Sequence, residues 1–358
     1  MRWRRLLSLM GKEFIQIKRD RRTLGMMIVI PLLWLLLFGY AMSFDVRDIA
    51  AGIVGGPEDP MTQMVAGVLG ASDYFDVTED RFATRADLEE AMRLGEVSMG
   101  VIPPQADGTP GTLIVDGSNL FEAQTAARQL QTIAQGLTEQ QGGAKAMPFE
   151  TEILYNPDLR SANAMIPGLV GLVMVLIATI MTAMGVVRER ERGTLEQLMV
   201  TPLSSTELMI GKIAPYLVIS LVDFVIVLVA GVFIFDVPFA GSPLLLFGLS
   251  LIFLVACLGM GLLVSTVSQT QQQAMQMAVF TLLPQILLSG FIFPLNAITW
   301  GVRWIAYLFP LTYFLPICRG IFVKDLGIAN LWPYALILVG YAVAVVLFAA
   351  WRFRRRLA

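Results

Sequence analysis

Six apolar stretches, each long enough to form a membrane-spanning helix, constrain this chain more than any other feature. A helix needs about 20 apolar residues to cross the hydrocarbon core of a bilayer. The composition agrees with a lipid environment, because 56% of the 358 residues are hydrophobic and only 15% are charged. A soluble domain is about a quarter charged. We therefore expect a polytopic α-helical membrane protein with six transmembrane helices per protomer, at residues 23–44, 164–187, 213–235, 243–267, 273–293 and 331–351.

The distribution of Lys and Arg gives this arrangement an orientation. Basic residues concentrate in short segments that remain in the cytoplasm. Sixteen of the 26 basic residues lie in residues 1–22, in the loop 188–212 and in the tail after residue 351. These three segments fall on the same side of the membrane, so we expect both termini in the cytoplasm. Residues 1–22 also show apolar side chains at helical spacing, which predicts a cytoplasmic interfacial helix before the first span.

The segment 45–160 has the opposite charge and is expected outside the cell membrane as an inserted α/β domain between spans 1 and 2. It holds 19 acidic and 7 basic residues, a net charge of −12. That charge either solvates the surface or attracts cations or a basic partner. Apolar runs and Gly or Pro breaks predict a small sheet with helices packed on it. The expected strands are 49–54, 97–102, 112–115 and 149–155, and the expected helices are 87–94 and 122–141.

The first apolar stretch has a second interpretation as a cleaved signal peptide, because it follows an Arg-rich start. Ala41-Met42-Ser43 loosely resembles a cleavage site. The apolar core of a signal peptide is roughly 7–15 residues long. The stretch 23–44 is longer, which favours a retained transmembrane helix.

Residues 289–324, between spans 5 and 6, suit neither a spanning helix nor an ordinary loop. Pro294, Pro310 and Pro316 interrupt the segment, yet it is rich in Phe, Trp and Tyr. Irregular backbone at membrane depth is tolerated where protein or a water-filled cavity surrounds it. We expect a re-entrant region of short half-helices entering from the outer face. An aromatic belt at the membrane interface is the alternative, and the two are compatible.

The sequence excludes several kinds of chemistry. It contains no histidine, so a histidine metal site or general base is absent. The two cysteines, Cys257 and Cys318, lie in apolar stretches without paired spacing, and we interpret them as buried small hydrophobic residues. The chain has no GxxxxGK[ST] phosphate-binding loop and no basic stripe for nucleic acid. We therefore expect no catalytic residue, no metal site and no cofactor bound by this chain.

The segment RERERGTLEQLMVTP (residues 188–202) begins where span 2 leaves the membrane. Gly193 allows a sharp change of direction, and Thr194 is placed to cap a short helix over 195–200. Leu195, Leu198 and Met199 would share one face of that helix. Such a helix either fits a groove on a soluble partner or lies on the bilayer surface, and its residues do not distinguish between these two interpretations.

Three segments of the chain resemble ABC-2 type ABC transporter permeases. RERERGTLEQLMVTPLSSTELMIGK is similar to the coupling region of that family. SGFIFPLNAITWGVRWIAYLFPLTYFLPICRGIF is similar to its outer re-entrant region, and KEFIQIKRDRRTLGMMIVIPLLWLLLFGYA to its interfacial helix and first span. The resemblance is strong over 161–358, the expected ABC-2 transmembrane domain. The large domain after span 1 resembles a bacterial subgroup associated with multidrug export, in which this domain is periplasmic.

The resemblance implies a specific assembly in the bacterial inner membrane. Two permease copies, identical or homologous, would form a dimer, each docked on a separate ATP-binding subunit that holds ATP and Mg²⁺. The loop 188–212 would couple that subunit to the helices. The sequence leaves a periplasmic adaptor protein open as a further partner. By resemblance, the docking residues are Glu191, Gly193, Thr194, Leu195, Glu196, Leu198, Thr201 and Pro202.

Asp223 is the one charged residue inside the six apolar stretches. A carboxylate at mid-membrane costs about 2.5–3.5 kcal/mol on insertion scales, so it needs a compensating role. It faces a substrate path, hydrogen-bonds across helices or stays protonated. With the aromatic side chains of Phe291, Phe293 and Tyr313 it forms our candidate substrate path. Gly248, Gly259 and Gly261 in span 4 instead predict close helix packing.

We expect a permease that exports hydrophobic or amphipathic substrates, with drug-like molecules favoured over lipid or polysaccharide. The alternative is a membrane-anchored envelope receptor or assembly factor acting through the outer domain, for which one anchor would suffice. A proton-driven secondary transporter is disfavoured, because the chain shows no internal repeat and its spans hold a single acidic residue.

Overall fold

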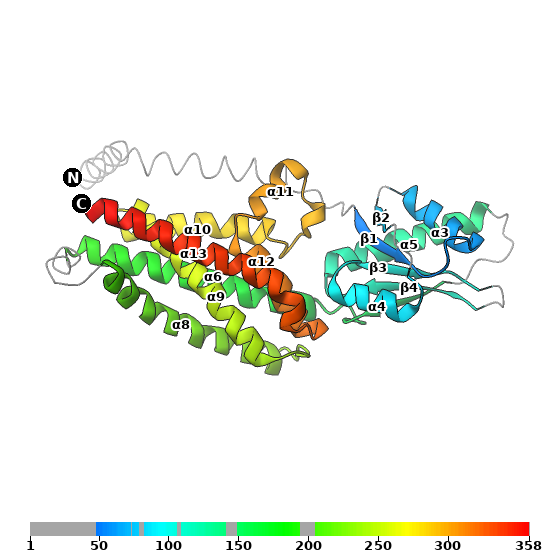
Figure 1. Ribbon diagram of the computed structural model, residues 1–358, viewed down its shortest axis with the longest axis horizontal. Helices are drawn as coiled ribbons and strands as arrows, with labels where there is room; N and C mark the ends of the chain where they lie inside the picture. The colour runs from blue at the N-terminus through cyan, green and yellow to red at the C-terminus, as the bar shows by residue number, and fades with distance from the viewer. Residues whose placement is uncertain are drawn as a thin grey trace, which may run out of the picture.

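The computed structural model describes residues 48–72, 74–78, 82–105, 109–140, 149–193 and 205–357. The expected interfacial helix 1–22 and first span 23–44 lie outside these residues. Figure 1 shows an α/β region (residues 49–154) at one end of the long axis and a bundle of long helices occupying the rest.

The α/β region is built on a five-stranded sheet in the order β2-β1-β3-β4-β5. Strand β3 pairs with β4 in antiparallel fashion, and the other neighbouring pairs are parallel. In chain order its elements are β1 (Ile49–Ile53), α3 (Pro60–Gly70), β2 (Phe75–Val77), α4 (Arg85–Leu94), β3 (Met99–Ile102), β4 (Gly111–Asp116), α5 (Leu120–Gln140) and β5 (Phe149–Leu154).

Side chains alternate across this sheet, so each face carries its own apolar cluster. Leu69 of α3 and Leu130 of α5 share one cluster with Ile49, Met99 and other strand residues. Leu88 and Met92 of α4 pack with Ile114 on the opposite face. The sheet therefore has helices packed on it, as the sequence predicts, and they cover both of its faces.

All six elements predicted for this region are confirmed as elements, with ends shifted by at most three residues. Helix α3 and strand β2 were not predicted. Asp59 caps α3 by accepting hydrogen bonds from the backbone N–H groups of Met61 and Thr62, a cap followed by Pro at the first helical position. That start signal was available in the sequence, whereas β2 has only three residues and little pattern.

The bundle contains six α-helices of ten residues or more among the described residues. They are α6 (Ser161–Glu191), α8 (Ser205–Phe233), α9 (Pro243–Val267), α10 (Gln271–Leu288), α12 (Pro310–Lys324) and α13 (Ile328–Leu357). The 3₁₀ turn η1 (Leu295–Ala297) and the short helix α11 (Trp300–Ala306) lie between α10 and α12.

Four helices in the described part of the chain are long and apolar enough to cross a membrane, and a bent pair raises the number to five. The predicted spans 164–187, 213–235, 243–267 and 331–351 each fall on one of the four, α6, α8, α9 and α13. The predicted span 273–293 is wrong at its end, because α10 stops at Leu288 and Gly290 has a φ of +92°. Glutamines at its start also make α10 too polar to meet the same criterion.

The re-entrant prediction for 289–324 agrees with the helices found there. Helices α11 and α12 meet at a bend of 79°, the geometry of a broken span or a re-entrant loop. Trp300 and Trp304 of α11 are exposed, whereas Phe314 of α12 is fully buried. The segment thus has an exposed aromatic side and a buried one, and its position in the membrane stays a prediction.

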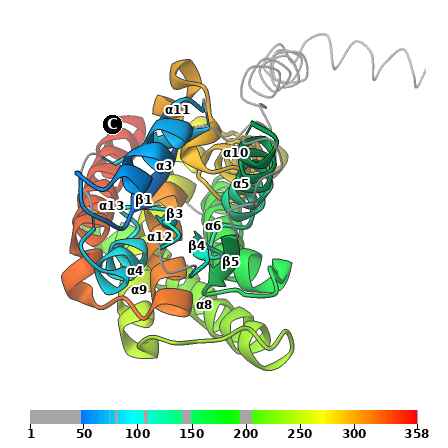
Figure 2. The same cartoon turned by 90° about the vertical axis from the view of Figure 1, so that its right-hand side faces the viewer.

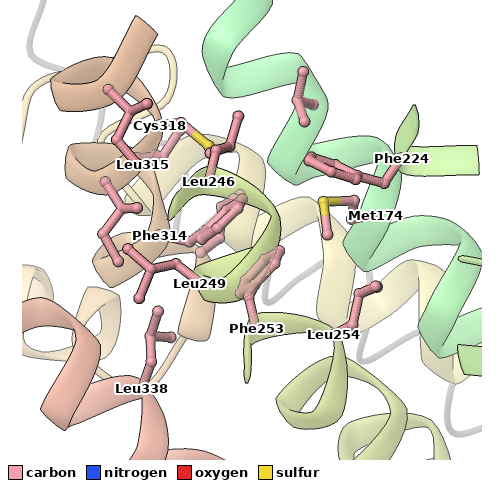
Figure 3. Close-up of a cluster of buried hydrophobic side chains, with 14 of the residues drawn as sticks. Met174, Phe224, Leu246, Leu249, Phe253, Leu254, Phe314, Leu315, Cys318 and Leu338 are labelled. Atoms are coloured by element: carbon pink, nitrogen blue, oxygen red, sulfur yellow. The ribbon is translucent and has the colours of Figure 1, made fainter. Parts of the chain in front are cut away.

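The bundle core joins all of its long helices, with α10 packing on it through the partly buried Leu282 and Ile286. Figure 3 shows Met174 of α6, Phe224 of α8, Phe253 of α9, Phe314 of α12 and Leu338 of α13 around one apolar cluster. The rings of Phe253 and Phe314 are stacked, with centroids 4.0 Å apart and an interplanar angle of 5°. Helix α12 is therefore fixed to the spanning helices by its buried face.

Two of the three glycines predicted to support close packing in α9 do so. A Cβ on Gly261 would lie 2.7 Å from the carbonyl oxygen of Thr179 in α6, and one on Gly259 would lie 2.9 Å from Val345 in α13. The prediction is wrong for Gly248, where a Cβ would meet nothing within 4 Å. Cys257 and Cys318 are buried free thiols in this core, as expected.

Candidate functional site

The described part of the predicted docking segment is the end of α6. Glu191 is the last residue of that helix, and Gly193 follows with a φ of +70°, a conformation that favours glycine. Gly193 therefore has a backbone conformation that permits the predicted change of direction. Thr194, Leu195, Glu196, Leu198, Thr201 and Pro202 lie outside the described residues.

Glu191 holds the start of α10. Its Oε1 atom accepts a hydrogen bond from the backbone N–H of Gln271 at 2.9 Å, and its Oε2 atom accepts one from Gln271 Nε2 at 2.6 Å. The first N–H groups of a helix lack partners within the helix, and the positive end of the helix dipole favours a carboxylate. The end of α6 is thus attached to the first turn of α10.

Two arginines strengthen this attachment, and one of them, Arg190, extends it to α9. Arg190 Nη1 donates to the carbonyl oxygens of Ser265 at 3.0 Å and Ser268 at 2.7 Å, where α9 ends. Arg188 Nε donates to Gln271 Oε1 at 3.2 Å. We call this set of contacts the loop end of the bundle. It joins α6, α9 and α10 directly before the predicted docking segment.

The four residues of the candidate substrate path do not form one cluster. Asp223 lies on α8, and its Oδ2 atom is buried without a hydrogen-bond partner among the described residues. Phe291 packs in the bundle core, where it faces Gly168 of α6. Phe293 instead faces α5, with its ring centroid 6.0 Å from that of Phe121. The hydroxyl of Tyr313 donates to the carbonyl oxygen of Tyr307 at 2.9 Å. Their role in a substrate path remains a prediction.

The sequence interpretation missed a buried ion pair between the α/β region and the bundle. Lys324, at the end of α12, pairs with Asp116, at the end of β4, and their side chains are only 9% and 8% exposed. Lys324 Nζ also donates to the carbonyl oxygen of Met92 at 2.9 Å and lies 5.3 Å from the centre of the Tyr155 ring. Burial and the charge of Asp116 raise the pKa of Tyr155 to about 12, so its phenol is neutral at physiological pH.

A second acid and a second base meet in the same place. Glu122 of α5 is partly buried and hydrogen-bonded to the side chains of Ser98 and Asn296, and burial raises the pKa of its carboxyl group above the ordinary value. Arg319 of α12 donates from Nη2 to the carbonyl oxygen of Phe291 at 3.2 Å. Figure 2, viewed along the bundle, shows the sheet in front of α12, where these residues lie. We call this contact the α/β junction.

A signal for these residues was present in the sequence. Arg319 and Lys324 are the only charges between Pro310 and Lys324, in a stretch that is otherwise largely apolar. Basic residues in such a setting need partners, and no acid lies near them in that helix. The acids come from the α/β region about 200 residues earlier, and a single sequence does not reveal such a pairing.

The described residues contain no group of three or more Cys, Asp or Glu side chains placed to hold a metal ion. The two ends of the bundle carry contacts between separate elements. One end joins three helices beside a loop, and the other joins a bent helix pair to a folded α/β region.

Apolar helices of spanning length, a bent pair and a separate α/β region define a polytopic membrane protein. The description "ABC-2 family transporter protein" applies to the family that matches residues 21–351. The chain belongs to this ABC-2 family of transporter proteins.

Curated relatives of this chain agree with the family assignment. The probable multidrug ABC transporter permease YbhS of Escherichia coli K12 is 33% identical over 371 residues, which cover 99% of this chain and 98% of the relative. The probable multidrug ABC transporter permease YbhR of the same organism is 30% identical over 353 residues, which cover 93% and 95%. ABC transporter G family member 20 of Dictyostelium discoideum is 22% identical over 360 residues, but these cover only 49% of that protein.

Proposed function

We propose that this chain is the permease subunit of an ATP-driven exporter in the bacterial inner membrane. A separate ATP-binding subunit docks on the loop 188–212 at the cytoplasmic face. The observation that carries this proposal is the loop end, where Glu191 and Arg190 attach α6 to α10 and α9 directly before the docking segment. The names of the two Escherichia coli relatives, which describe probable multidrug permeases, support it.

The rest of the assembly follows from this assignment. A second permease, identical or homologous, completes a dimer, and the partner subunits bind ATP and Mg²⁺. Both termini lie in the cytoplasm, so the α/β region lies on the periplasmic side. The substrates are hydrophobic or amphipathic molecules, drug-like ones foremost, that enter from the membrane or the cytoplasm.

Helix α6 provides a route from the docking loop to the outer side. It has 31 residues and is therefore about 46 Å long at about 1.5 Å per residue. At its other end, Gly168 and Gly171 allow close contact with Phe291 and Phe314 of the re-entrant region. ATP binding by the partner shifts the helices only if it favours one arrangement over another. A rigid helix in contact with both ends transmits such a shift.

The docking assignment is tested with Leu195→Arg and Glu196→Arg in the full-length chain. The ATP-binding partner is identified from neighbouring open reading frames and co-expressed. We expect both variants to fold and insert, but to recover several-fold less partner on co-purification and to lose the Mg²⁺-dependent ATP hydrolysis of the complex. Asp158→Arg, the same charge change on an exposed residue at the other end, serves as the control. Normal partner recovery in both docking variants would refute the assignment.

The receptor or assembly-factor alternative receives less support. A single anchor would be sufficient for such a protein, whereas four described helices have spanning length and composition. The loop end joins three helices in a way that an anchor does not require.

A further inference from the structure

A cavity lies at the α/β junction, between the sheet and α12. Its volume is about 380 Å³, and its lining comes from both parts of the protein. The α/β region contributes the ends of α4 and β4 and the start of α5, and the bundle contributes α12, the start of α13 and the chain after α10. Ligand sites have volumes of about 300–1,000 Å³, so this chamber lies at the small end of that range.

The charges that line the chamber leave one cation without a matched partner. Lys324 is paired with Asp116, and Arg93 is paired with Glu90 at 2.7 Å. Arg319 is left with Glu122, and burial raises the pKa of the Glu122 carboxyl group above its ordinary value. Among the described residues, Arg319 makes no ion pair: its Nη2 atom donates to the carbonyl oxygen of Phe291, and its Nε atom has no hydrogen-bond partner.

Three polar atoms of the lining residues are buried without hydrogen-bond partners among the described residues. They are Nε of Arg319, Oγ of Ser289 and Oδ1 of Asn296. Ser289 is only 1% exposed. Buried polar groups are almost always hydrogen-bonded, so unpartnered ones require an explanation. Three of them around one cavity indicate a polar occupant that completes their bonds.

Part of the chamber lining is apolar. Leu315 of α12, Leu326 and Leu331 line it beside Tyr334 of α13. A site with a few placed polar groups and an apolar wall orients a molecule that has one polar and one apolar end. The chamber thus has the chemistry of a site for an amphipathic ligand.

We propose that the chamber binds amphipathic acids, with Arg319 holding the carboxylate, phosphate or sulfonate group and Leu315 and Leu331 contacting the apolar part. This inference deepens the proposed function and rests on it, since it names the class of substrate that the exporter binds on its periplasmic side before release. Ser289 donates a second hydrogen bond to the anionic group. Asn296 Oδ1 accepts one from any N–H or O–H group beside it.

The test compares two fluorescent probes of nearly equal size on the full-length chain in lipid nanodiscs. Anilinonaphthalene sulfonate is an amphipathic anion, and phenylnaphthylamine is the same ring system without the sulfonate. Binding of each is measured by equilibrium dialysis, with empty nanodiscs subtracted. Wild type is compared with Arg319→Gln and with Arg160→Gln, which removes an exposed positive charge on the same side.

We expect the wild type to bind the sulfonate more tightly than the uncharged probe. Arg319→Gln should weaken sulfonate binding at least about tenfold, because a hydrogen bond to a charged group is lost. Phenylnaphthylamine binding and the Arg160→Gln control should not change. Ser289→Ala, which leaves the charges in place, should weaken sulfonate binding by a smaller factor and serves as the deciding variant if Arg319→Gln does not fold.

Unchanged sulfonate binding in both chamber variants would overturn the proposal, and so would an equal loss of both probes. Saturable binding that no chamber variant alters would mean that water fills the chamber and the probe binds elsewhere. This assay needs no ATP-binding partner. A negative result accompanied by normal partner-dependent ATP hydrolysis would remove the substrate assignment and leave the permease function standing.

Discussion

The two ends of the bundle are both held by charged side chains, but in opposite surroundings. At the α/β junction, Lys324 and Asp116 are less than a tenth exposed and sit between two folded layers. At the loop end, Glu191 is exposed and Gln271 is half-buried, and the hydrogen bond between their side chains is exposed to solvent. The same kind of contact therefore has different consequences at the two ends.

Burial sets how easily each end can rearrange. Removing one partner of a buried ion pair leaves an uncompensated charge, which is strongly destabilising. Exposed polar contacts exchange readily with water and contribute little net stability. The junction thus acts as a fixed joint between α12 and the α/β region, whereas the loop end can change with the state of a docked partner.

The largest expected effect concerns the buried pair. Lys324→Met leaves Asp116 buried without its counter-charge, and breaking such a pair costs about 3–5 kcal/mol. We expect a clear drop in the thermal unfolding midpoint of the detergent-purified protein. Arg85→Met, which breaks the exposed contacts of Arg85 with Glu89 and Glu152, should cost about 1 kcal/mol or less.

A double variant sharpens this result. Lys324→Met combined with Asp116→Leu removes both charges and should recover much of the lost stability, because an apolar pair of similar volume replaces an ion pair at little cost. Equal midpoints for Lys324→Met and Arg85→Met would show that the junction is no more fixed than the surface.

A smaller effect is expected from the pH dependence of Glu122. Its folded-state pKa is raised by burial above the ordinary value of 4.5, so the folded protein binds this proton more tightly than the unfolded chain. The contribution is fully present below the unfolded pKa and is lost as pH rises through the folded pKa. Wild type should therefore lose stability over that window relative to Glu122→Gln. Unfolding midpoints measured against pH should show the difference, with the exposed Glu150→Gln as control.

A parallel pH profile of wild type and Glu122→Gln would mean that Glu122 is ionised in the folded protein. In that case it balances Arg319, and the junction carries no net positive charge.

Local sequence patterns were sufficient for most elements of the fold. The strand at Ile49–Ile53 and the helix at Pro243–Val267 were predicted because their apolar residues occur in runs of suitable length with clear ends. The end of α10 was not predicted correctly. The apolar run continues past Ser289, whereas the backbone turns at Gly290. Hydropathy alone does not register such a turn.

The candidate sites divide in the same way. The special backbone conformation of Gly193 was predicted, because a glycine directly after a charged helix end is a local signal. The partners of Glu191 and Lys324 were not predicted. Gln271 lies 80 residues from Glu191 in the chain, and Asp116 lies 208 residues from Lys324. Contacts of that separation depend on how α6 and α12 pack, which no local pattern encodes.

The smallest effect on stability is expected at the loop end, from Glu191→Ala. The exposed carboxylate gives up two hydrogen bonds to Gln271, and water takes its place, so the unfolding midpoint should stay close to that of wild type. Amide exchange at Gln271 should instead rise several-fold, because its N–H loses its acceptor. Arg192→Ala, the neighbouring exposed residue, should leave that exchange unchanged. If Glu191→Ala lowered the midpoint as far as Lys324→Met does, the loop end would be as rigid as the junction. Movement of a docked partner would then have to reach the helices by another route than the α6–α10 contact.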